Sequence, residues 1–390
     1  MKPIDDIYRD KYDFTILVLQ GGGALGAYQA GVFEGLVEAG FVPNWIAGVS
    51  IGSVNAALIA GNPPDRRVER LREFWDLVTS GVPSELPREY AFADPQRLWT
   101  NRFSAAASAT FGVPGFYTPR MPPAFLAPVG SNEALSFYDN AELEATLEKL
   151  VDFDRINRGP VRLSLGAVDV ETGNSTYFDS VEAPILARHV LASGALPPAF
   201  APVEIGGRFY WDGGIASNTP LWYVLDSAPR MRALIVQVDL FSAAGERPRD
   251  LDQVLERRKD IAYSSKTRFN TTRVRELQRL RSTAHRLLGK LPAELRSDPD
   301  TKALEEMCDS THIDIVHLIN RPGAYSSSSK DYEFSRATMR WRWNAGLEDV
   351  RRSVAHPDWL KGSQLAEGIR VYDLTGGDGR GEAVLEREHA

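Results

Sequence analysis

The chain has 390 residues, a formal net charge of −7, and hydrophobic and charged fractions of 43% and 25%. These values are typical of a globular protein with one large domain or two ordinary ones, and the acidic balance argues against nucleic-acid binding. One cysteine, Cys308, excludes an internal disulfide and a metal site of several cysteines. No stretch is apolar enough for a transmembrane helix or a signal peptide, so we expect a cytoplasmic protein. We expect it to work without a metal or a cofactor.

The first 60 residues predict a βαβ unit. Residues 14–20 are a short apolar run of the kind found in buried parallel strands, and residues 24–40 place apolar side chains at helical spacing. Residues 44–50 predict a second strand, and 51–61 a second helix. Because such crossovers are right-handed, the carboxyl ends of the two strands are expected at the same edge of the sheet.

The α/β pattern is interrupted and then resumes. Residues 104–130 are rich in alanine, proline and aromatic residues, too proline-broken for a helix and too apolar for a solvated linker. The segments before and after this stretch are regular. They predict a surface helix at 67–78, a hairpin at 161–178, a helix at 184–192, a strand entering a tight turn at 206–214, and a buried strand at 233–240.

The character of the chain changes after residue 240. Charged helices are expected over 250–295, a returning strand at 312–320 and an amphipathic helix at 335–354. We therefore expect an α/β domain over 1–240, a mainly helical extension packing on it over 241–370, and a flexible tail over 371–390.

Gly21, Gly23 and Gly26 follow the first strand with the G-x-G-x-x-G spacing of dinucleotide-binding loops. That use requires a carboxylate about 20 residues further on, at the end of the second strand. The residue at that position is Ser50, and residues 39–64 contain no acid. The sequence therefore argues against a dinucleotide site and leaves the loop amides available for a different anion.

Residues 48–52 read G-x-S-x-G between a strand and a helix, which is the context of a nucleophile elbow. Gly48 and Gly52 allow the sharp turn that presents the hydroxyl of Ser50 at the end of the strand. Amides of the glycine loop at the same edge suit an oxyanion that forms when Ser50 attacks an acyl carbon. The alternative interpretation is a plain tight turn and a serine that caps a helix.

Asp212 is the candidate base. It follows a strand and precedes Gly213 and Gly214, so its carboxylate is expected at a sheet edge, whereas a plain Asp-Gly hairpin turn is the alternative. None of the six histidines lies in a glycine-rich turn. An α/β-hydrolase is disfavoured, because in that fold several strands precede the nucleophile and here only one does. Burial beside the apolar strand is expected to raise the pKa of Asp212.

Taken together, four blocks in order across residues 14–220 resemble the patatin-like phospholipase family. Residues 21–26 are similar to its oxyanion loop, 48–52 to its nucleophile elbow, 192–202 to a loop of small residues and prolines, and 212–220 to the segment of its dyad aspartate. Leu25 stands where the family often has Arg or Lys. Beyond about residue 240 the chain resembles a C-terminal extension of some bacterial members.

The resemblance implies a three-layer patatin-like α/β fold with a central, mainly parallel sheet and a largely helical C-terminal extension. It implies a lipid acyl hydrolase of the phospholipase A, lysophospholipase or carboxylesterase type, working through an acyl-serine intermediate on lipid or other esters. A storage-polyester depolymerase and a degenerate lipid-binding scaffold are the alternatives. The implied roles are Ser50 as nucleophile, Asp212 as general base, the amides of Gly21, Gly22 and Gly23 as oxyanion hole, and Gly26, Gly48, Gly52, Gly213 and Gly214 as supporting positions.

Two further segments suggest contact with lipid. Residues 104–130 combine aromatic residues with five prolines, which predicts a mobile apolar lid or interfacial surface, with ordinary core packing as the alternative. Residues 257–290 carry eleven Lys and Arg against Asp260 and Glu276, together with an apolar stripe at helical spacing. This stretch predicts either a helix packed on the acidic domain or peripheral attachment to an anionic membrane.

Overall fold

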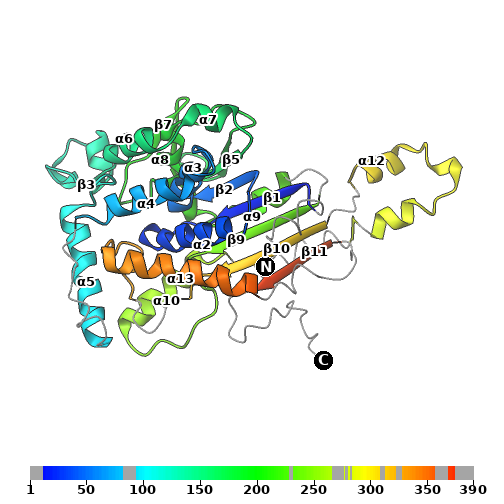
Figure 1. The fold of residues 1–390 in the computed structure, drawn as a ribbon. Helices are drawn as coiled ribbons and strands as arrows, with labels where there is room; N and C mark the ends of the chain where they lie inside the picture. Colours follow the sequence, from blue (N-terminus) through cyan, green and yellow to red (C-terminus); the bar gives the residue numbers. More distant parts are fainter. Residues whose placement is uncertain are drawn as a thin grey trace.

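The computed structural model describes residues 12–81, 94–227, 232–265, 276, 280–281, 283–307, 312–321, 327–355 and 368–373 (Figure 1). Within this part of the chain one large sheet forms the centre of the molecule. Its strands are β1 (Phe14–Leu19), β2 (Trp45–Val49), β5 (Arg162–Asp169), β6 (Ser175–Asp179), β7 (Val203–Ile205), β8 (Arg208–Asp212), β9 (Ala233–Asp239), β10 (His312–Ile319) and β11 (Gly368–Asp373). A separate small ladder pairs β3 (Thr118–Pro119) with β4 (Tyr138–Asp139).

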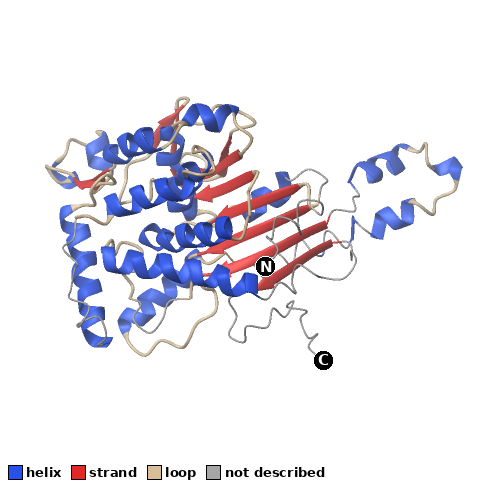
Figure 2. Ribbon diagram, in the orientation of Figure 1, coloured by secondary structure: helices blue, strands red, loops and turns tan. Residues whose placement is uncertain are grey.

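Helices cover the sheet and extend beyond it (Figure 2). They are α2 (Gly26–Glu38), α3 (Ile51–Ala60), α4 (Arg67–Val78), α5 (Asp94–Phe111), α6 (Ala141–Leu150), α7 (Phe153–Arg158), α8 (Ala187–Gly194), α9 (Leu221–Ser227), α10 (Leu251–Tyr263), α12 (Pro299–Met307) and α13 (Arg336–Ala355). Short 3-10 turns are η1 (Gly23–Leu25), η3 (Ala124–Leu126), η4 (Asn132–Leu135), η5 (Gly213–Ile215) and η6 (Ala293–Leu295).

The strand order is β11-β10-β9-β1-β2-β5-β8-β7, and β6 pairs with β5 outside this path. The strands from β11 to β5 all run parallel, whereas β6, β7 and β8 add antiparallel pairs at one end. The carboxyl ends of the parallel strands point toward the side of the molecule where α5 lies (Figure 1). The predicted strands at 14–20, 44–50, 233–240 and 312–320 are confirmed.

Both faces of the sheet are buried, as the apolar runs predict. Successive side chains of a strand point to opposite faces, and in β1 Leu17 and Leu19 enter the larger core beneath α2, α3 and α13. Ile16 and Val18 enter a second cluster on the other face, where Leu221 of α9 packs. The sheet therefore lies between helices on both faces, which confirms the three-layer α/β fold class.

The C-terminal extension is part of the same sheet and core. Strand β10 pairs with β9 from Ile313 opposite Ala233 onward, and β11 continues the sheet beyond β10. Helix α13 packs along α2 so closely that a Cβ on Gly31 would lie 1.8 Å from the carbonyl oxygen of Trp343. The extension thus does more than pack on the outside of the first domain.

Two boundaries differ from the sequence-based prediction. Residues 104–111 are the end of α5 and not irregular, because the first proline of the stretch, Pro114, lies after the helix has ended. Residues 371–373, predicted as tail, end β11, since pairing with β10 supplies their backbone hydrogen bonds. Cys308, residues 374–390 and most of the basic stretch between 266 and 279 lie outside the described residues.

Candidate active site

Ser50 lies between the end of β2 and the start of α3, with backbone angles φ 56° and ψ −125°. It is the one residue other than glycine with positive φ in the described part of the chain, a conformation that costs of order 1–3 kcal/mol and is concentrated at functional sites. The turn requires glycine on both sides. A Cβ on Gly48 would lie 2.4 Å from the carbonyl oxygen of Gly52, and one on Gly52 2.3 Å from that of Leu19. This geometry supports the nucleophile-elbow interpretation.

The hydroxyl of Ser50 does not cap α3, which argues against the helix-cap alternative. It interacts instead with the side chain of Asp212, and this interaction lowers the pKa of that carboxyl. The backbone amide of Ser50 donates to both the carbonyl and the hydroxyl oxygen of Ser193, at 3.1 Å each. The hydroxyl of Ser193 donates in turn to the carbonyl of Gly166 at 2.6 Å. The segment at 192–202 therefore fixes the backbone of the elbow.

Asp212 ends β8, and strand register brings it to Ser50. Strand β8 runs antiparallel to β5 and places Asp212 opposite Ala167, while the adjacent Gly166 pairs with Val49 of β2. The carboxylate therefore arrives at the level where β2 ends and Ser50 begins.

Burial controls the ionisation of this carboxylate. Asp212 is 2% exposed, and desolvation raises its pKa from 3.8 to about 6, while the nearby Ser50 hydroxyl and the hydrogen bond from the amide of Gly214 oppose that rise. The Gly214 amide donates to Oδ1 at 2.7 Å. A base with a pKa near 6 is deprotonated at neutral pH, and its pKa is closer to that pH than the pKa of an ordinary aspartate. General base catalysis requires both properties.

The glycine loop connects β1 to α2 beside the elbow. The amide of Gly21 donates to the backbone carbonyl of Asn218 at 3.1 Å, so it is engaged within the protein. Gly22 and Gly23 line the cavity in front of Ser50, and among the described residues their amides have no acceptor. Of the three amides predicted for an oxyanion hole, the geometry thus leaves two to face a ligand.

Asn218 holds the loop at a second point, because its Nδ2 donates to the carbonyl of Gly21 at 3.1 Å. Gly26 and Gly213 lie in tight contacts as well. A Cβ on Gly26 would lie 2.6 Å from Cγ1 of Ile51, and one on Gly213 2.6 Å from the carbonyl oxygen of Gly166. The predicted supporting glycines thus join the loop, the elbow and the aspartate segment.

A cavity of about 350 Å³ opens in front of Ser50 and Asp212. Aromatic side chains gather around Phe116, which lies 5.6 Å from Tyr117 and 5.9 Å from Phe334 between ring centroids. Aliphatic groups complete the apolar wall, which includes Ile51, Val54, Phe116, Tyr117, Tyr138, Leu143, Leu196, Ala199, Phe200 and Phe334. Such a wall suits an apolar chain attached to the group that Ser50 attacks.

The sequence did not indicate that the C-terminal extension contributes to the cavity, yet Phe241, Tyr263, Asp331, Tyr332 and Phe334 all line it. The segment that carries three of them reads SSSSKDYEFS and has neither periodicity nor a motif. Its place at the site depends on contacts with elements that are distant in sequence, so no local signal identified it.

Among the described residues no histidine lines the cavity, and Nε2 of His317 lies 2.5 Å from a carboxylate oxygen of Asp239. No group of three or more His, Cys, Asp or Glu residues there is placed to hold a metal ion. None of the described helices combines the length and apolarity needed to cross a bilayer.

A strained serine that shares a cavity with a buried carboxylate and an amide-lined loop is typical of hydrolases that form an acyl-serine. Residues 17–225 match the family described as patatin-like phospholipase, and residues 261–365 match one described as patatin phospholipase. The chain therefore belongs to the patatin-like phospholipase family, a family of lipid ester hydrolases.

Individual relatives share either low sequence identity or only a short matching stretch with this chain. The chain is 26% identical over 250 residues to the uncharacterized protein YqhO of Bacillus subtilis, which covers 60% of this chain and 73% of that protein. It is 47% identical over 51 residues to triacylglycerol lipase SDP1L of Arabidopsis thaliana, covering 13% of this chain and 6% of that protein. Among solved structures, VipD from Legionella pneumophila aligns with a TM-score of 0.33 and 14% identity over 86% of this chain and 67% of VipD.

Proposed function

We propose that the protein is a lipid acyl hydrolase in which Ser50 is the nucleophile and Asp212 the general base. The observation that carries the proposal is that Ser50 and the buried carboxylate of Asp212 line the same aromatic-lined cavity, where the Ser50 hydroxyl interacts with that carboxylate. The substrate is a carboxyl ester of a phospholipid, a lysophospholipid or a related lipid, with its acyl chain in that cavity.

The reaction follows from the positions of these groups. Asp212 accepts the hydroxyl proton as Oγ of Ser50 attacks the ester carbonyl carbon, and the negative charge on the carbonyl oxygen is stabilised by the amides of Gly22 and Gly23. The tetrahedral intermediate collapses to an acyl-serine, and the protonated Asp212 returns the proton to the leaving alcohol. Asp212 then deprotonates a water molecule that attacks the acyl-serine, releasing the fatty acid and restoring the Ser50 hydroxyl.

The proposal includes an interfacial role for residues 104–130. The inner side of this segment lines the cavity through Phe116 and Tyr117. Its outer side exposes Phe111 and Phe125, each 80% accessible, together with Met121 and Leu126. Exposed apolar side chains on a segment that also lines the cavity suit contact with aggregated lipid.

The test combines turnover with labelling of the nucleophile. The wild type is expected to hydrolyse p-nitrophenyl esters and to be labelled at Ser50 by a fluorophosphonate, whereas Ser50→Ala should do neither. Wild-type protein that binds lipid but shows no turnover and no labelling would be a degenerate scaffold. Lipid profiling after incubation with a bacterial lipid extract then identifies the head group and the acyl position, and a parallel assay on a storage polyester tests the depolymerase alternative.

A further inference from the structure

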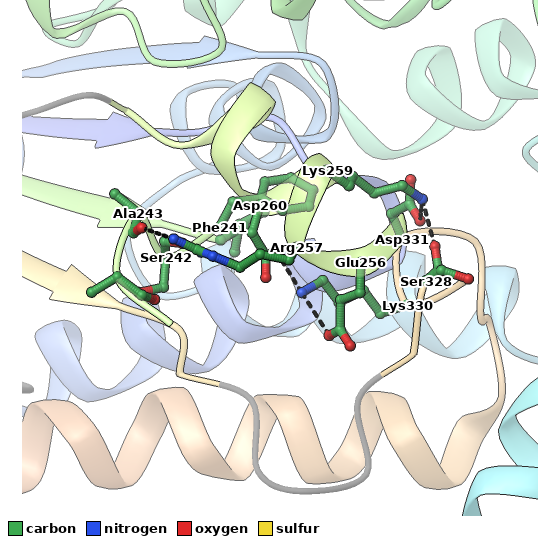
Figure 3. A network of polar contacts seen from close by, with 12 residues as sticks. Phe241, Ser242, Ala243, Glu256, Arg257, Lys259, Asp260, Ser328, Lys330 and Asp331 are labelled. Atoms are coloured by element: carbon green, nitrogen blue, oxygen red, sulfur yellow. Dashed lines mark hydrogen bonds and ion pairs between the residues drawn. The ribbon is translucent and has the colours of Figure 1, made fainter. Parts of the chain in front are cut away.

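A short segment of the C-terminal extension, residues 327–335 and here called the strap, lies between α10 and α13 (Figure 3). It contributes Asp331, Tyr332 and Phe334 to the cavity. The strap therefore belongs to the site although it lies outside residues 17–225, where the catalytic motifs occur.

The strap contacts the glycine loop directly. The carbonyl oxygen of Asp331 accepts a hydrogen bond from the amide of Ala24 at 2.7 Å. It is so close that a Cβ on Gly23 would lie 2.1 Å from it. Ala24 is held through its carbonyl as well, because Nη1 of the buried Arg342 donates to that oxygen at 3.0 Å. The C-terminal extension thus binds both the amide and the carbonyl of Ala24, the residue that follows Gly22 and Gly23.

The strap is anchored to α10 by a buried charge network (Figure 3). Lys330 is 4% exposed, and its Nζ lies 3.0 Å from a carboxylate oxygen of Glu256 and 2.6 Å from one of Asp260. Lys259 reaches back from α10, with Nζ at 2.6 Å from both the carboxylate of Asp331 and the carbonyl of Ser328. Each element therefore sends a lysine to acceptors on the other.

Two more contacts connect this anchor to the site. Nη2 of Arg342 donates to the carbonyl of Lys330 at 2.7 Å, which joins the anchor to the residue that binds Ala24. At its far end α10 offers the carbonyl of Tyr263 to Nδ2 of Asn218 at 2.8 Å, and Asn218 in turn binds Gly21. Helix α10 thus supports the glycine loop through both the strap and Asn218.

We infer that Lys330 is a positioning residue for ester hydrolysis: by fixing the strap on α10 it holds the amides of Gly22 and Gly23 where the oxyanion forms. This inference rests on the proposed function of the site. Oxyanion donors act only when they are aligned before the reaction, and a misplacement of about 1 Å costs up to ~100-fold in rate. Because the oxyanion develops only after Ser50 attacks and is absent from the bound substrate, loosening the loop affects kcat and leaves substrate binding nearly unchanged.

The test compares Lys330→Met with two further variants of the anchor. We expect Lys330→Met to lower kcat on a p-nitrophenyl acetate probe by about 10- to 100-fold with KM changed less than about twofold. Lys330→Arg should restore most of the rate, because it keeps the charge near both carboxylates. Lys259→Met loosens the same strap through a more exposed pair, since the side chains of Lys259 and Asp331 are 21% and 24% exposed. It should lower kcat in the same direction by a smaller factor.

The matched control is Arg162→Met, which breaks another half-buried ion pair, between Arg162 and Asp179 at 2.8 Å, away from the cavity. It should leave kcat within about twofold of wild type, whatever it does to the melting temperature. The inference is overturned if Lys330→Met keeps the wild-type kcat, or if Arg162→Met loses as much rate as Lys330→Met.

Hydrogen exchange supplies a readout that does not depend on catalysis. In Lys330→Met the peptide covering residues 20–26 should exchange at least about 10-fold faster than in wild type, because the amide of Ala24 loses its fixed acceptor. Arg162→Met should not change exchange in this peptide. If wild type lacks both esterase activity and fluorophosphonate labelling, the proposed function fails, and the exchange rates still decide whether Lys330 braces the loop.

Discussion

Ser50 and Asp212 line the same cavity, and the Ser50 hydroxyl lowers the pKa of the Asp212 carboxyl, although Ser50 follows β2 and Asp212 ends β8 on the far side of β5. The pair joins a strained backbone to a buried acid. Strain and burial of an ionisable group both reduce stability, so structures keep them where they serve a function. The consequences for activity, ionisation and stability are separately measurable.

If Ser50 and Asp212 act as a unit, Ser50→Ala and Asp212→Asn should each lower kcat for ester hydrolysis by at least about 1,000-fold. The reason is that neither the nucleophile nor its base works without the other. Steady-state hydrolysis of a soluble nitrophenyl ester measures the loss, and circular dichroism checks that the fold is retained. Single replacements of His189 and His285 serve as controls, and a histidine variant as inactive as Ser50→Ala would indicate a triad instead.

The pH dependence of kcat/KM should report the raised pKa of Asp212. Burial raises that pKa to about 6, and the base works only when deprotonated. Activity is therefore expected to increase through pH 6 and to continue into the alkaline range. A pH profile of kcat/KM on a neutral, soluble ester gives this acidic limb. A limb that disappears in a histidine variant would assign it to that histidine and contradict the prediction.

The same raised pKa predicts that the base destabilises the fold at neutral pH. A folded-state pKa above the ordinary value means that Asp212 favours folding when protonated, and this contribution is lost as the pH rises through about 6. The difference corresponds to about 3 kcal/mol near pH 8. Asp212→Asn should therefore be the more stable protein at pH 8, with the gain shrinking toward pH 4. Urea unfolding of both proteins across this range measures it, and equal stability at every pH would refute the assignment.

Residues 104–130 should separate hydrolysis of aggregated lipid from that of soluble esters. Phe125 is exposed on the outer side, so Phe125→Ser should lower the rate on phospholipid vesicles several-fold and leave a soluble ester unaffected. Phe116 lines the cavity, so Phe116→Ser should lower both rates. Val181, which is also exposed, offers a control as Val181→Ser. Equal losses on vesicles for Phe125→Ser and the control would remove the interfacial role.

The sequence was informative wherever a function depends on a local turn. Gly48, Ser50 and Gly52 make one elbow within five residues, and Asp212 stands in a glycine turn, so residue types and spacing made both candidates and the family resemblance supplied their roles. The register that places Asp212 opposite Ala167 is set by pairing between distant strands. No pattern near Asp212 encodes that register.

The hydrogen-bonded amide of Gly21 and the position of the strap also depend on contacts between distant segments, which the local sequence does not reveal. Gly21 does not differ from its neighbours in sequence. Only the structure shows that its amide donates to the carbonyl of Asn218, whereas the amides of Gly22 and Gly23, the other predicted oxyanion donors, do not have such an acceptor among the described residues. Lys330 follows a run of serines and resembles a residue of a solvated loop, yet acidic side chains of α10 make its burial favourable. A pair of charges that are far apart in the chain leaves no periodic signal.

The described basic residues between Arg257 and Lys290 fall into two groups, those bound within the protein and those that are exposed. Arg257 donates to the carbonyl of Ser242, and Lys259 binds Asp331, so neither is available to a membrane. Arg281, Arg286 and Lys290 are exposed. The part of the chain around them, with α12, projects beyond the sheet on the side away from α5 (Figure 1). A membrane contact there would lie opposite the carboxyl edge of the sheet, where Ser50 is found.

Membrane attachment and interfacial hydrolysis are therefore expected to be separable. If the exposed basic residues bind anionic lipid, reversing Arg281, Arg286 and Lys290 to Glu should abolish sedimentation with anionic liposomes at low salt and leave soluble-ester hydrolysis unchanged. Binding of the wild type should weaken steeply with salt, since the Debye length falls from about 10 Å at 0.1 M to about 3 Å at 1 M. Phe125→Ser should show the reverse pattern, with sedimentation kept and vesicle hydrolysis lowered. Wild-type protein that ignores anionic liposomes at low salt would instead assign the basic stretch to packing on this protein or on a partner subunit.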